Sequence, residues 1–157
     1  MRIFLAAPIS GFENENEYLT YRKKVVELID GLKKGFVVMS ELERVESVGS
    51  YDSPEQSVIK DFTDIKEADC FMLLHPRRMQ TSAFIELGYA YAMKKPSLII
   101  AHPKDLPYMA LGLNNKSVPS LIVSPDATNL KNIIMSILTD WEKNIDNSKP
   151  REHNWEV

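Results

Sequence analysis

Short apolar runs alternate along the chain with longer segments that have helical periodicity. The runs are continuously apolar instead of alternating with polar positions, which is typical of strands buried on both faces of a parallel sheet. They cover residues 3–7, 36–39, 70–74, 98–101 and 121–123. The pattern therefore predicts five parallel strands.

Between these runs, apolar residues recur at the three- and four-residue spacing of amphipathic helices. The second helix is expected to begin after Ser53-Pro54, a good cap followed by a favourable first-turn residue. The four predicted helices carry their apolar residues within 18–32, 58–65, 83–93 and 130–141. The third segment is apolar nearly all round, so we expect it to be the most buried helix. Gly88 within it costs about 1 kcal/mol relative to alanine and is expected to allow close packing against the sheet.

The alternation of strands and helices implies right-handed crossovers and helices on both faces of an open sheet. It predicts an α/β, flavodoxin-like three-layer sandwich whose five-stranded parallel sheet has the order 2-1-3-4-5. Ligands of such folds bind beyond the carboxyl ends of the strands, here at the loops 7–11, 75–82 and 102–115. Residues 1–145 are expected to form a single domain and residues 146–157 a polar tail.

Composition narrows the class of protein. Among 157 residues, 44% are apolar and 26% charged, as in ordinary globular domains. The net charge of −3 gives no basic surface for a nucleic acid polymer. No apolar run approaches the ~18 residues of a membrane span, and residues 1–5 do not resemble a signal peptide, so a cytoplasmic protein without a membrane partner is expected. The single cysteine, Cys70, excludes an internal disulfide and a multi-thiolate zinc site.

Several common chemistries lack their motifs. The chain has no GxGxxG, no GxxxxGK[ST] and no HExxH sequence. Its histidines, His75, His102 and His153, are scattered, and we expect the two at strand ends, His75 and His102, to have no catalytic duty. No serine lies on a GxSxG elbow, so a Ser-His-Asp triad has no support. We therefore predict no metal ion and no redox cofactor.

Glu86 is the carboxylate that fits its surroundings least. It lies just after the first turn of the apolar segment 83–93, with Ser82 as the expected N-cap. An unpaired buried charge costs several kcal/mol, so this carboxylate must be paired, protonated or used in function. The helix dipole favours its ionised form and burial opposes it, a balance found in nucleophiles and bases. The alternative is that Glu86 only complements the helix dipole.

Asp61 is the second candidate carboxylate. On a helical wheel it flanks the apolar stripe of Val58, Phe62 and Ile65, whereas Asp64 points further towards solvent. Spacing alone is equally compatible with an ordinary solvated acid on a helix.

Three blocks of sequence resemble a known family. They are the opening strand 2–9, the segment Asp61-Phe62-x-x-Ile65-x-x-Ala68-Asp69, and the segment Thr81-Ser82-x-x-x-Glu86-Leu87-Gly88-Tyr89-Ala90-x-Ala92-x-x-Lys95-Pro96. Together they resemble the nucleoside 2-deoxyribosyltransferase-like family, which includes deoxynucleoside 5'-monophosphate N-glycosidases and CMP hydrolases. The similarity runs from Arg2 to about Val123, and the third block is the most specific.

The resemblance implies an enzyme that cleaves the bond between a nucleobase and its sugar. Glu86 would attack the anomeric carbon and form a glycosyl-enzyme intermediate, and Asp61 would bind the sugar or assist catalysis. A hydrolase then passes the sugar to water, and a transferase passes it to another base. Members usually form homodimers or larger assemblies in which a neighbouring subunit completes each site. The expected substrate-binding residues are Phe4, Ala6, Pro8, Ser10, Gln80, Ser82, Met109 and Gly112.

The chain departs from the family pattern at three positions. Phe4 stands where transferases have a tyrosine whose hydroxyl contacts the glutamate, and phenylalanine cannot donate that hydrogen bond. Its absence leaves more room for a sugar 2'-hydroxyl. Gln80 stands where transferases have an acid near the base, and Pro107 falls where a polar substrate contact is common. The base, the sugar and the need for a 5'-phosphate stay open.

Two other functions remain compatible with the sequence. A TIR-like NAD glycohydrolase also places a glutamate in a flavodoxin-like crevice. A nucleotide-binding sensor could retain the pocket without turnover, and Phe4 is consistent with that. A flavin-binding protein fits less well, because no Ser/Thr-rich phosphate loop follows the first strand.

Overall fold

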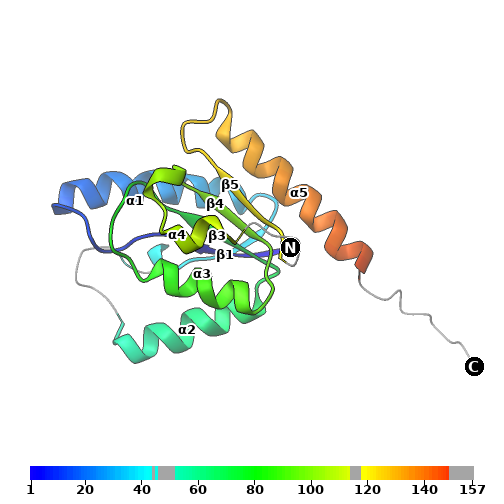
Figure 1. Cartoon of the computed structure of the whole chain (residues 1–157), viewed down its shortest axis with the longest axis horizontal. Coiled ribbons are helices and arrows are strands. Elements are labelled where there is room, and N and C mark those ends of the chain that lie inside the picture. The colour runs from blue at the N-terminus through cyan, green and yellow to red at the C-terminus, as the bar shows by residue number, and fades with distance from the viewer. Residues whose placement is uncertain (44, 46–51, 114–117, 149–157) are drawn as a thin grey trace, which may run out of the picture. The chain divides into compact units, whose positions relative to one another are not determined.

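The computed structural model describes residues 1–43, 45, 52–113 and 118–148. Helices and strands alternate along these residues as the apolar pattern predicts (Figure 1). In chain order the elements are β1 (Arg2–Ala6), α1 (Glu15–Leu32), β2 (Val37–Met39), the 3-10 turn η1 (Glu41–Glu43), α2 (Pro54–Glu67), β3 (Cys70–Leu74), α3 (Ala83–Ala92), β4 (Ser97–Ile100), the 3-10 turn η2 (Pro103–Asp105), α4 (Tyr108–Leu111), β5 (Ser120–Val123) and α5 (Leu130–Ser148).

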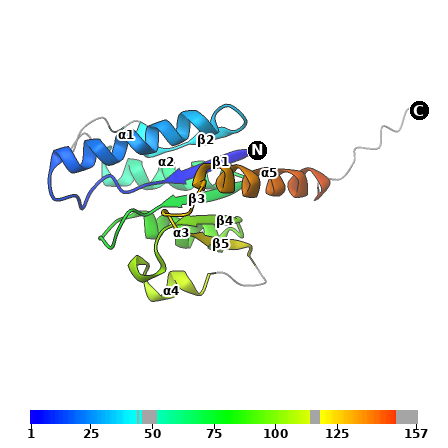
Figure 2. The same cartoon turned by 90° about the horizontal axis from the view of Figure 1, so that it is seen from above.

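The five strands form one sheet in the order β2-β1-β3-β4-β5, and every neighbouring pair is parallel (Figure 2). This confirms the predicted fold class and strand order. Every side chain of β3 and β4 is buried, which explains why residues 70–74 and 98–100 are continuously apolar. No strand begins or ends more than one residue away from its predicted bound.

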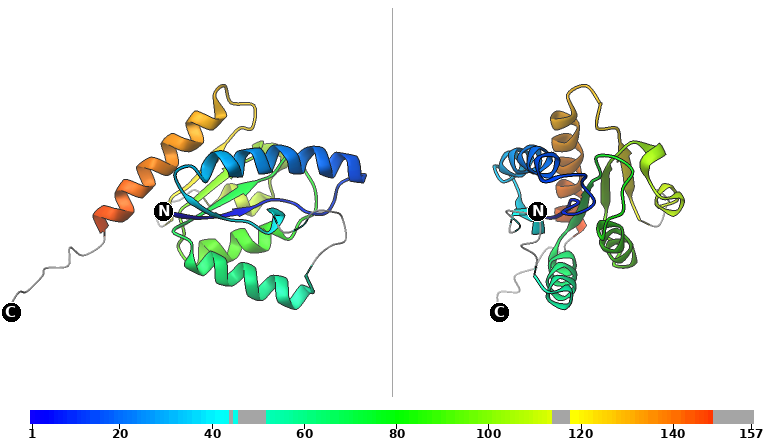
Figure 3. Two further views of the ribbon diagram at one scale, coloured as in Figure 1. Left: turned by 180° about the vertical axis from the view of Figure 1, so that it is seen from behind. Right: turned by 90° about the vertical axis from the view of Figure 1, so that its left-hand side faces the viewer.

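Helices cover both faces of the sheet. Helix α1 lies on one face, and α2 and α3 lie side by side on the other (Figure 3). The packing under α2 and α3 includes the stacked rings of Phe4 and Phe71, whose centroids are 5.8 Å apart, together with Leu73 and Leu87. The sheet thus fixes the positions of the two helices that carry Glu86 and Asp61.

The contacts within the chain divide it into two compact units, Met1–Ala127 and Thr128–Val157. The first contains the sheet with α1 to α4, and the second contains α5. The predicted last helix is confirmed, but it extends to Ser148, so the first three residues of the predicted tail are helical. Residues 149–157 lie outside the described residues, and the single domain over 1–145 stays a prediction. Nowhere in the described helices is an apolar stretch long enough to span a membrane.

Helix α3 buries a larger share of its residues than α1 or α2, as its apolar sequence predicts: four of ten are buried, against four of 18 and two of 14. Its outer face is nevertheless exposed, because Ala83, Leu87 and Ala90 pack inward while Ile85 is 66% exposed. Gly88 is exposed as well, and a Cβ added there would meet nothing within 4 Å. The close packing of Gly88 against the sheet was therefore a wrong interpretation. An apolar sequence can show which helix has an apolar outer face but not whether another element of the chain covers it.

The first turn of α2 is held by a capping box, which supports one prediction on stability. Ser53 Oγ accepts a hydrogen bond from the Gln56 amide (3.2 Å), and Gln56 Oε1 accepts one from the Ser53 amide (3.3 Å). Replacing Ser53 by alanine should lower the free energy of unfolding by about 1 kcal/mol, since an amide of the first turn loses its partner. Urea unfolding of both proteins measures this, and an unchanged midpoint would contradict the capping role.

Candidate active site

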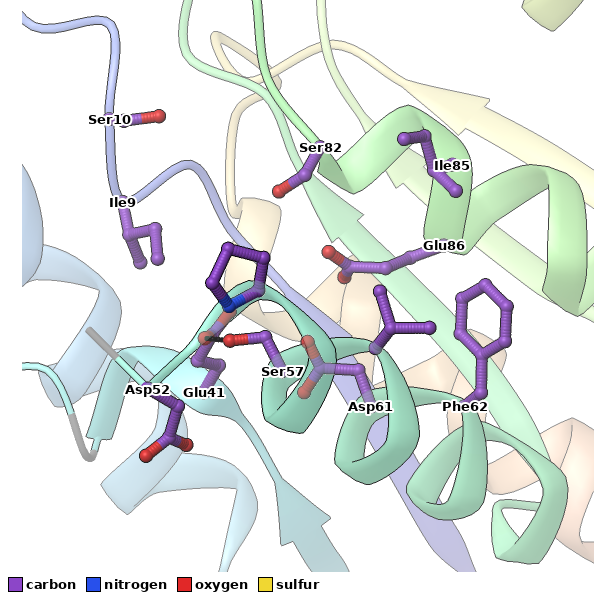
Figure 4. A pocket seen from close by; sticks show the side chains of 12 residues that line it. Ile9, Ser10, Glu41, Asp52, Ser57, Asp61, Phe62, Ser82, Ile85 and Glu86 are labelled. Carbon is purple, nitrogen blue, oxygen red and sulfur yellow. Dashed lines mark hydrogen bonds between the residues drawn. The ribbon is translucent and has the colours of Figure 1, made fainter.

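A cavity of about 520 Å³ opens where the loop after β1 meets η1, the first half of α2 and the first turn of α3 (Figure 4). It lies beyond the carboxyl ends of the strands, as the fold predicts. Its lining residues are Ile9, Ser10, Glu41, Asp52, Pro54, Ser57, Val58, Asp61, Phe62, Ser82, Ile85 and Glu86. Carboxylates and apolar side chains therefore dominate its wall.

Glu86 is held in the first turn of α3 and is only 9% exposed. Ser82 occupies the N-cap position without a side-chain capping bond, so its hydroxyl faces the cavity. Burial is the largest cause that raises the pKa of Glu86, and together with the negative charges of Asp61 and Glu41 it raises that pKa to about 8. The predicted effect of burial on this residue is thus present, and every cause of the shift in its pKa acts in the same direction, against the expected influence of the helix dipole.

Asp61 and Glu41 complete a cluster of three carboxylates. Asp61 lies on α2 and is 5% exposed, and its side chain points towards that of Glu86 (Figure 4). Glu41 lies in η1, directly after β2, and accepts a hydrogen bond from Ser57 Oγ at 3.4 Å. One carboxylate oxygen from each of the three residues lies within 4.8 Å of the other two. Like charges this close favour shared protons, which suits acid–base chemistry.

The same oxygens are the kind of ligand that a hard divalent cation takes. Clustered acids are also what a glycosidase needs, because one carboxyl group must act as nucleophile while another handles protons. The spacing alone therefore does not define a metal centre.

Apolar side chains line the other part of the cavity. Val58 of α2 and Ile85 of α3 are 51% and 66% exposed, so they present apolar surface at its rim. Phe62 stacks on Tyr89 with ring centroids 4.0 Å apart, which joins α2 to α3 behind that rim. A flat, weakly polar group such as a nucleobase fits against a surface of this kind.

Two loops predicted to share this edge of the sheet are in contact. Gly11, after β1, has φ of +85°, and a Cβ there would lie 2.9 Å from the backbone oxygen of Gln80. Arg77 donates hydrogen bonds to Glu17 from Nε (3.1 Å) and to the Gly11 oxygen from Nη2 (3.5 Å). The close approach requires glycine at position 11 and fixes the loop that carries Ser10.

The structure brings four of the predicted site residues together at the cavity: Glu86, Asp61, Ser10 and Ser82. The other six, none of which is among the lining residues, are Phe4, Ala6, Pro8, Gln80, Met109 and Gly112. The first three of these are buried: Phe4 and Ala6 belong to β1 and pack in the hydrophobic core, and Pro8 follows that strand. Gln80 is exposed, Met109 is 84% exposed on α4, and Gly112 caps that helix. Their substrate contacts stay predictions.

Glu41 is the functional candidate that the sequence did not single out. It follows β2, and β2 is the neighbour of β1 in the sheet, so its end lies at the same edge as the loop 7–11. The strand order predicted from the sequence therefore contained the information that could have found it. Asp52 and Ser57, at the start of α2, line the cavity for the same topological reason.

Two of the three histidines and the cysteine lie in described parts of the chain away from the cavity. His75 is buried at the end of β3 with its ring edge against Phe84, and burial lowers its pKa while Asp105 acts in the opposite direction. His102 Nε2 lies 3.2 Å from Asp126, and His153 falls outside the described residues. Cys70 is a free, buried thiol whose pKa burial raises to about 12. His75, His102 and Cys70 are not among the residues that line the cavity.

No family model and no curated protein matches the sequence. Solved structures do match the fold. BlsM, in a solution structure, has a TM-score of 0.72 and 20% identity, with 96% of each chain covered. The CMP N-glycosidase BcmB of Clostridium botulinum has a TM-score of 0.58 and 21% identity over 88% of this chain and 98% of its own. A 2-deoxyribosyltransferase of Bacillus psychrosaccharolyticus has a TM-score of 0.51 and 23% identity over 71% of this chain and 80% of its own.

The chain shares the fold of these proteins. The resemblance inferred from the three sequence blocks is therefore confirmed at the level of the fold. At identities of 20–23%, the chemistry has to be argued from the cavity itself.

Proposed function

We propose that the chain belongs to the nucleoside 2-deoxyribosyltransferase-like family and cleaves the N-glycosidic bond of a nucleoside or nucleoside 5'-monophosphate. Two of the proteins that share its fold are described as a CMP N-glycosidase and a 2-deoxyribosyltransferase. The observation that carries the proposal is the buried pair of Glu86 and Asp61 in one cavity with apolar walls. A buried carboxylate with a raised pKa beside a second carboxylate is typical of glycoside-cleaving sites.

In the first step, the ionised Glu86 carboxylate attacks the anomeric carbon of the sugar. A bond forms between its oxygen and C1', and the bond between C1' and the base breaks, with the electron pair departing on the base nitrogen. The departing base takes up a proton from solvent, and Asp61 stays ionised. The products of this step are a glycosyl ester on Glu86 and the free base.

In the second step, an acceptor attacks C1' and regenerates Glu86. With water as acceptor, Asp61 takes the proton and the net reaction is hydrolysis to free sugar and base. With another base, the sugar is transferred. The oxygen separations within 4.8 Å support this two-step route, because retaining glycosidases hold their carboxyl groups about 5–5.5 Å apart and inverting ones about 6.5–9.5 Å.

The proposal is tested by base release from purified protein. A panel of ribonucleosides, deoxyribonucleosides, their 5'-monophosphates and NAD is incubated with the protein and resolved by chromatography. We expect free base from at least one nucleoside or nucleotide, with a second base in the mixture revealing transfer. Nicotinamide release from NAD alone would favour the glycohydrolase, and binding of nucleotides without any product would favour the sensor.

We also propose that a second copy of the chain covers the outer face of α2 and α3. These helices pack against each other, yet Val58, Ile59 and Ile85 are 51%, 60% and 66% exposed. Exposed apolar side chains gathered on neighbouring elements are typical of association surfaces. Gly88, with open space beyond it, allows another backbone to approach closely.

Replacing Gly88 by arginine should convert this dimer to a monomer without unfolding the chain. The added side chain meets nothing within the chain, and removal of glycine from a helix gains up to about 1 kcal/mol, so the thermal midpoint of the monomer should not fall. Light scattering coupled to size-exclusion chromatography measures the mass. The matched control is Glu27→Arg, an exposed position on α1, which should leave the mass unchanged. A parent protein that is already monomeric would contradict the proposal.

A further inference from the structure

The charged side chains among the described residues that line the cavity are all acidic. Glu41, Asp52, Asp61 and Glu86 line it, and the described lining residues include no lysine, arginine or histidine. Three of these acids lie within 4.8 Å of one another. A wall of this kind attracts cationic groups and repels anionic ones, because low-dielectric clefts with one sign of charge concentrate its field.

Two cations on elements that border the cavity already have acidic partners. Lys60 Nζ on α2 lies 3.7 Å from Asp52 Oδ2, so its positive charge balances that of the acid at one end of the cavity. Arg77, in the loop before α3, is bound to Glu17 of α1 and to the backbone of Gly11. To hold a phosphate, either side chain would have to give up these contacts.

The N-terminus of α3 and the hydroxyl groups of Ser10 and Ser82 are features of the described wall that favour an anion, but none of them carries a full positive charge. The macrodipole of α3 amounts to about half an elementary charge, and Glu86 in the first turn lies in that field. The amide of Ala83 is already a donor to Thr81 Oγ1 at 3.2 Å. Half a charge, partly compensated, does not offset the neighbouring cluster of carboxylates.

From this balance, and resting on the proposed function, we infer that the site takes uncharged or cationic nucleosides and discriminates against their 5'-monophosphates. When C1' contacts Glu86, the 5' end of the same sugar stays within about 10 Å, the Debye length at 0.1 M salt, of Glu41 and Asp61. A phosphate there is repelled by both. It would also hold the proton on Glu86 more tightly and so weaken the nucleophile, whereas a cationic base would favour the ionised form.

The experiment compares a nucleoside with its own 5'-monophosphate, using the base that is released fastest in the panel. Both substrates have the same leaving group, so the ratio of their kcat/KM values reports only on the 5' substituent. We expect the monophosphate to be poorer by roughly 100-fold at low salt. The 5'-O-sulfamate of the nucleoside is the size control, because it is tetrahedral like phosphate but uncharged, and it should react nearly as fast as the nucleoside.

Two further measurements separate charge from shape. Raising the salt concentration from 20 mM to 500 mM should reduce the ratio several-fold in the parent protein, since screening acts on charge alone. Glu41→Gln should reduce the ratio of kcat/KM for the nucleoside to that for its 5'-monophosphate by about tenfold at low salt. Glu27→Gln on α1 is the control and should leave this ratio unchanged. Equal rates for both substrates, faster cleavage of the monophosphate, or a ratio that ignores salt and extends to the sulfamate would each overturn the inference. Failure of every substrate to lose its base would instead overturn the proposed function.

Discussion

Glu86→Gln should lose base release and gain stability at alkaline pH. Removing a nucleophile that forms the covalent intermediate typically costs on the order of 10⁴-fold or more in rate. Glutamine keeps the size of the side chain and its capacity for hydrogen bonds but can neither ionise nor form the glycosyl ester. Chromatographic base release under saturating substrate measures the loss. Equal rates for parent and variant would eliminate Glu86 as the nucleophile.

The effect on stability follows from the same carboxyl group. The ordinary pKa of a glutamate side chain is 4.5, and that of Glu86 in the folded protein is about 8. Between these values the folded protein retains a proton that the unfolded chain has released, so the free energy of unfolding falls as the pH rises. Each pKa unit corresponds to about 1.4 kcal/mol, and the side chain is only 9% exposed, so the loss amounts to a few kcal/mol.

Parent and variant should therefore be similarly stable near pH 4, diverge as the pH rises, and differ most above pH 8. Urea unfolding at three pH values measures the two curves, with the exposed Glu27→Gln as the matched control. A variant that is less stable than the parent at pH 8 would show that Glu86 stabilises the fold as an ion, contrary to its burial. The expected result would mean that this site reduces stability in exchange for a reactive carboxylate.

The second large effect is on the pH dependence of base release. Because Glu86 must be ionised to attack, kcat/KM should rise with pH and level off above about pH 8, following the raised pKa of that group. Burial is the largest cause of the raised pKa, and the charges of Asp61 and Glu41 follow. Removing the charge of Glu41 should therefore lower the apparent pKa at which kcat/KM rises, without returning it to 4.5.

For Glu41→Gln we expect the apparent pKa of the rise in kcat/KM to fall by about one unit or less, since one like charge is removed and the burial of Glu86 remains. Asp52→Asn is the matched control. Asp52 lines the same cavity, but its charge is balanced by Lys60, so the rise in kcat/KM should occur at the same pH as in the parent protein. The apparent values belong to the coupled carboxylates as a group. If kcat/KM rises at the same pH in Glu41→Gln as in the parent protein, the charge of Glu41 does not affect the pKa of Glu86.

Much of the site could be predicted from local sequence. Glu86 was found because a carboxylate stands alone among apolar residues in one helix, and that contrast is visible without any tertiary contact. Asp61 was ambiguous, because a position flanking an apolar stripe can face either solvent or a neighbour. The structure shows it 5% exposed, covered where α2 packs against α3. Glu41 was missed, since a short polar turn after a strand has no periodicity to mark it.

The sequence by itself determined the strands, the helices and the order of the sheet. Strand burial, helix periodicity and crossover handedness are properties of consecutive residues, and they agree with one another along this chain. Only the tertiary structure decided that Glu41, Asp61 and Glu86 meet, and that Ile85 and Gly88 of an apolar helix face outward. The three acids come from three separate elements, so their separation depends on how the packed helices lie on the sheet. The mutual repulsion of these acids and the burial of Asp61 and Glu86, which together set the chemistry of Glu86, exist only once that packing has formed.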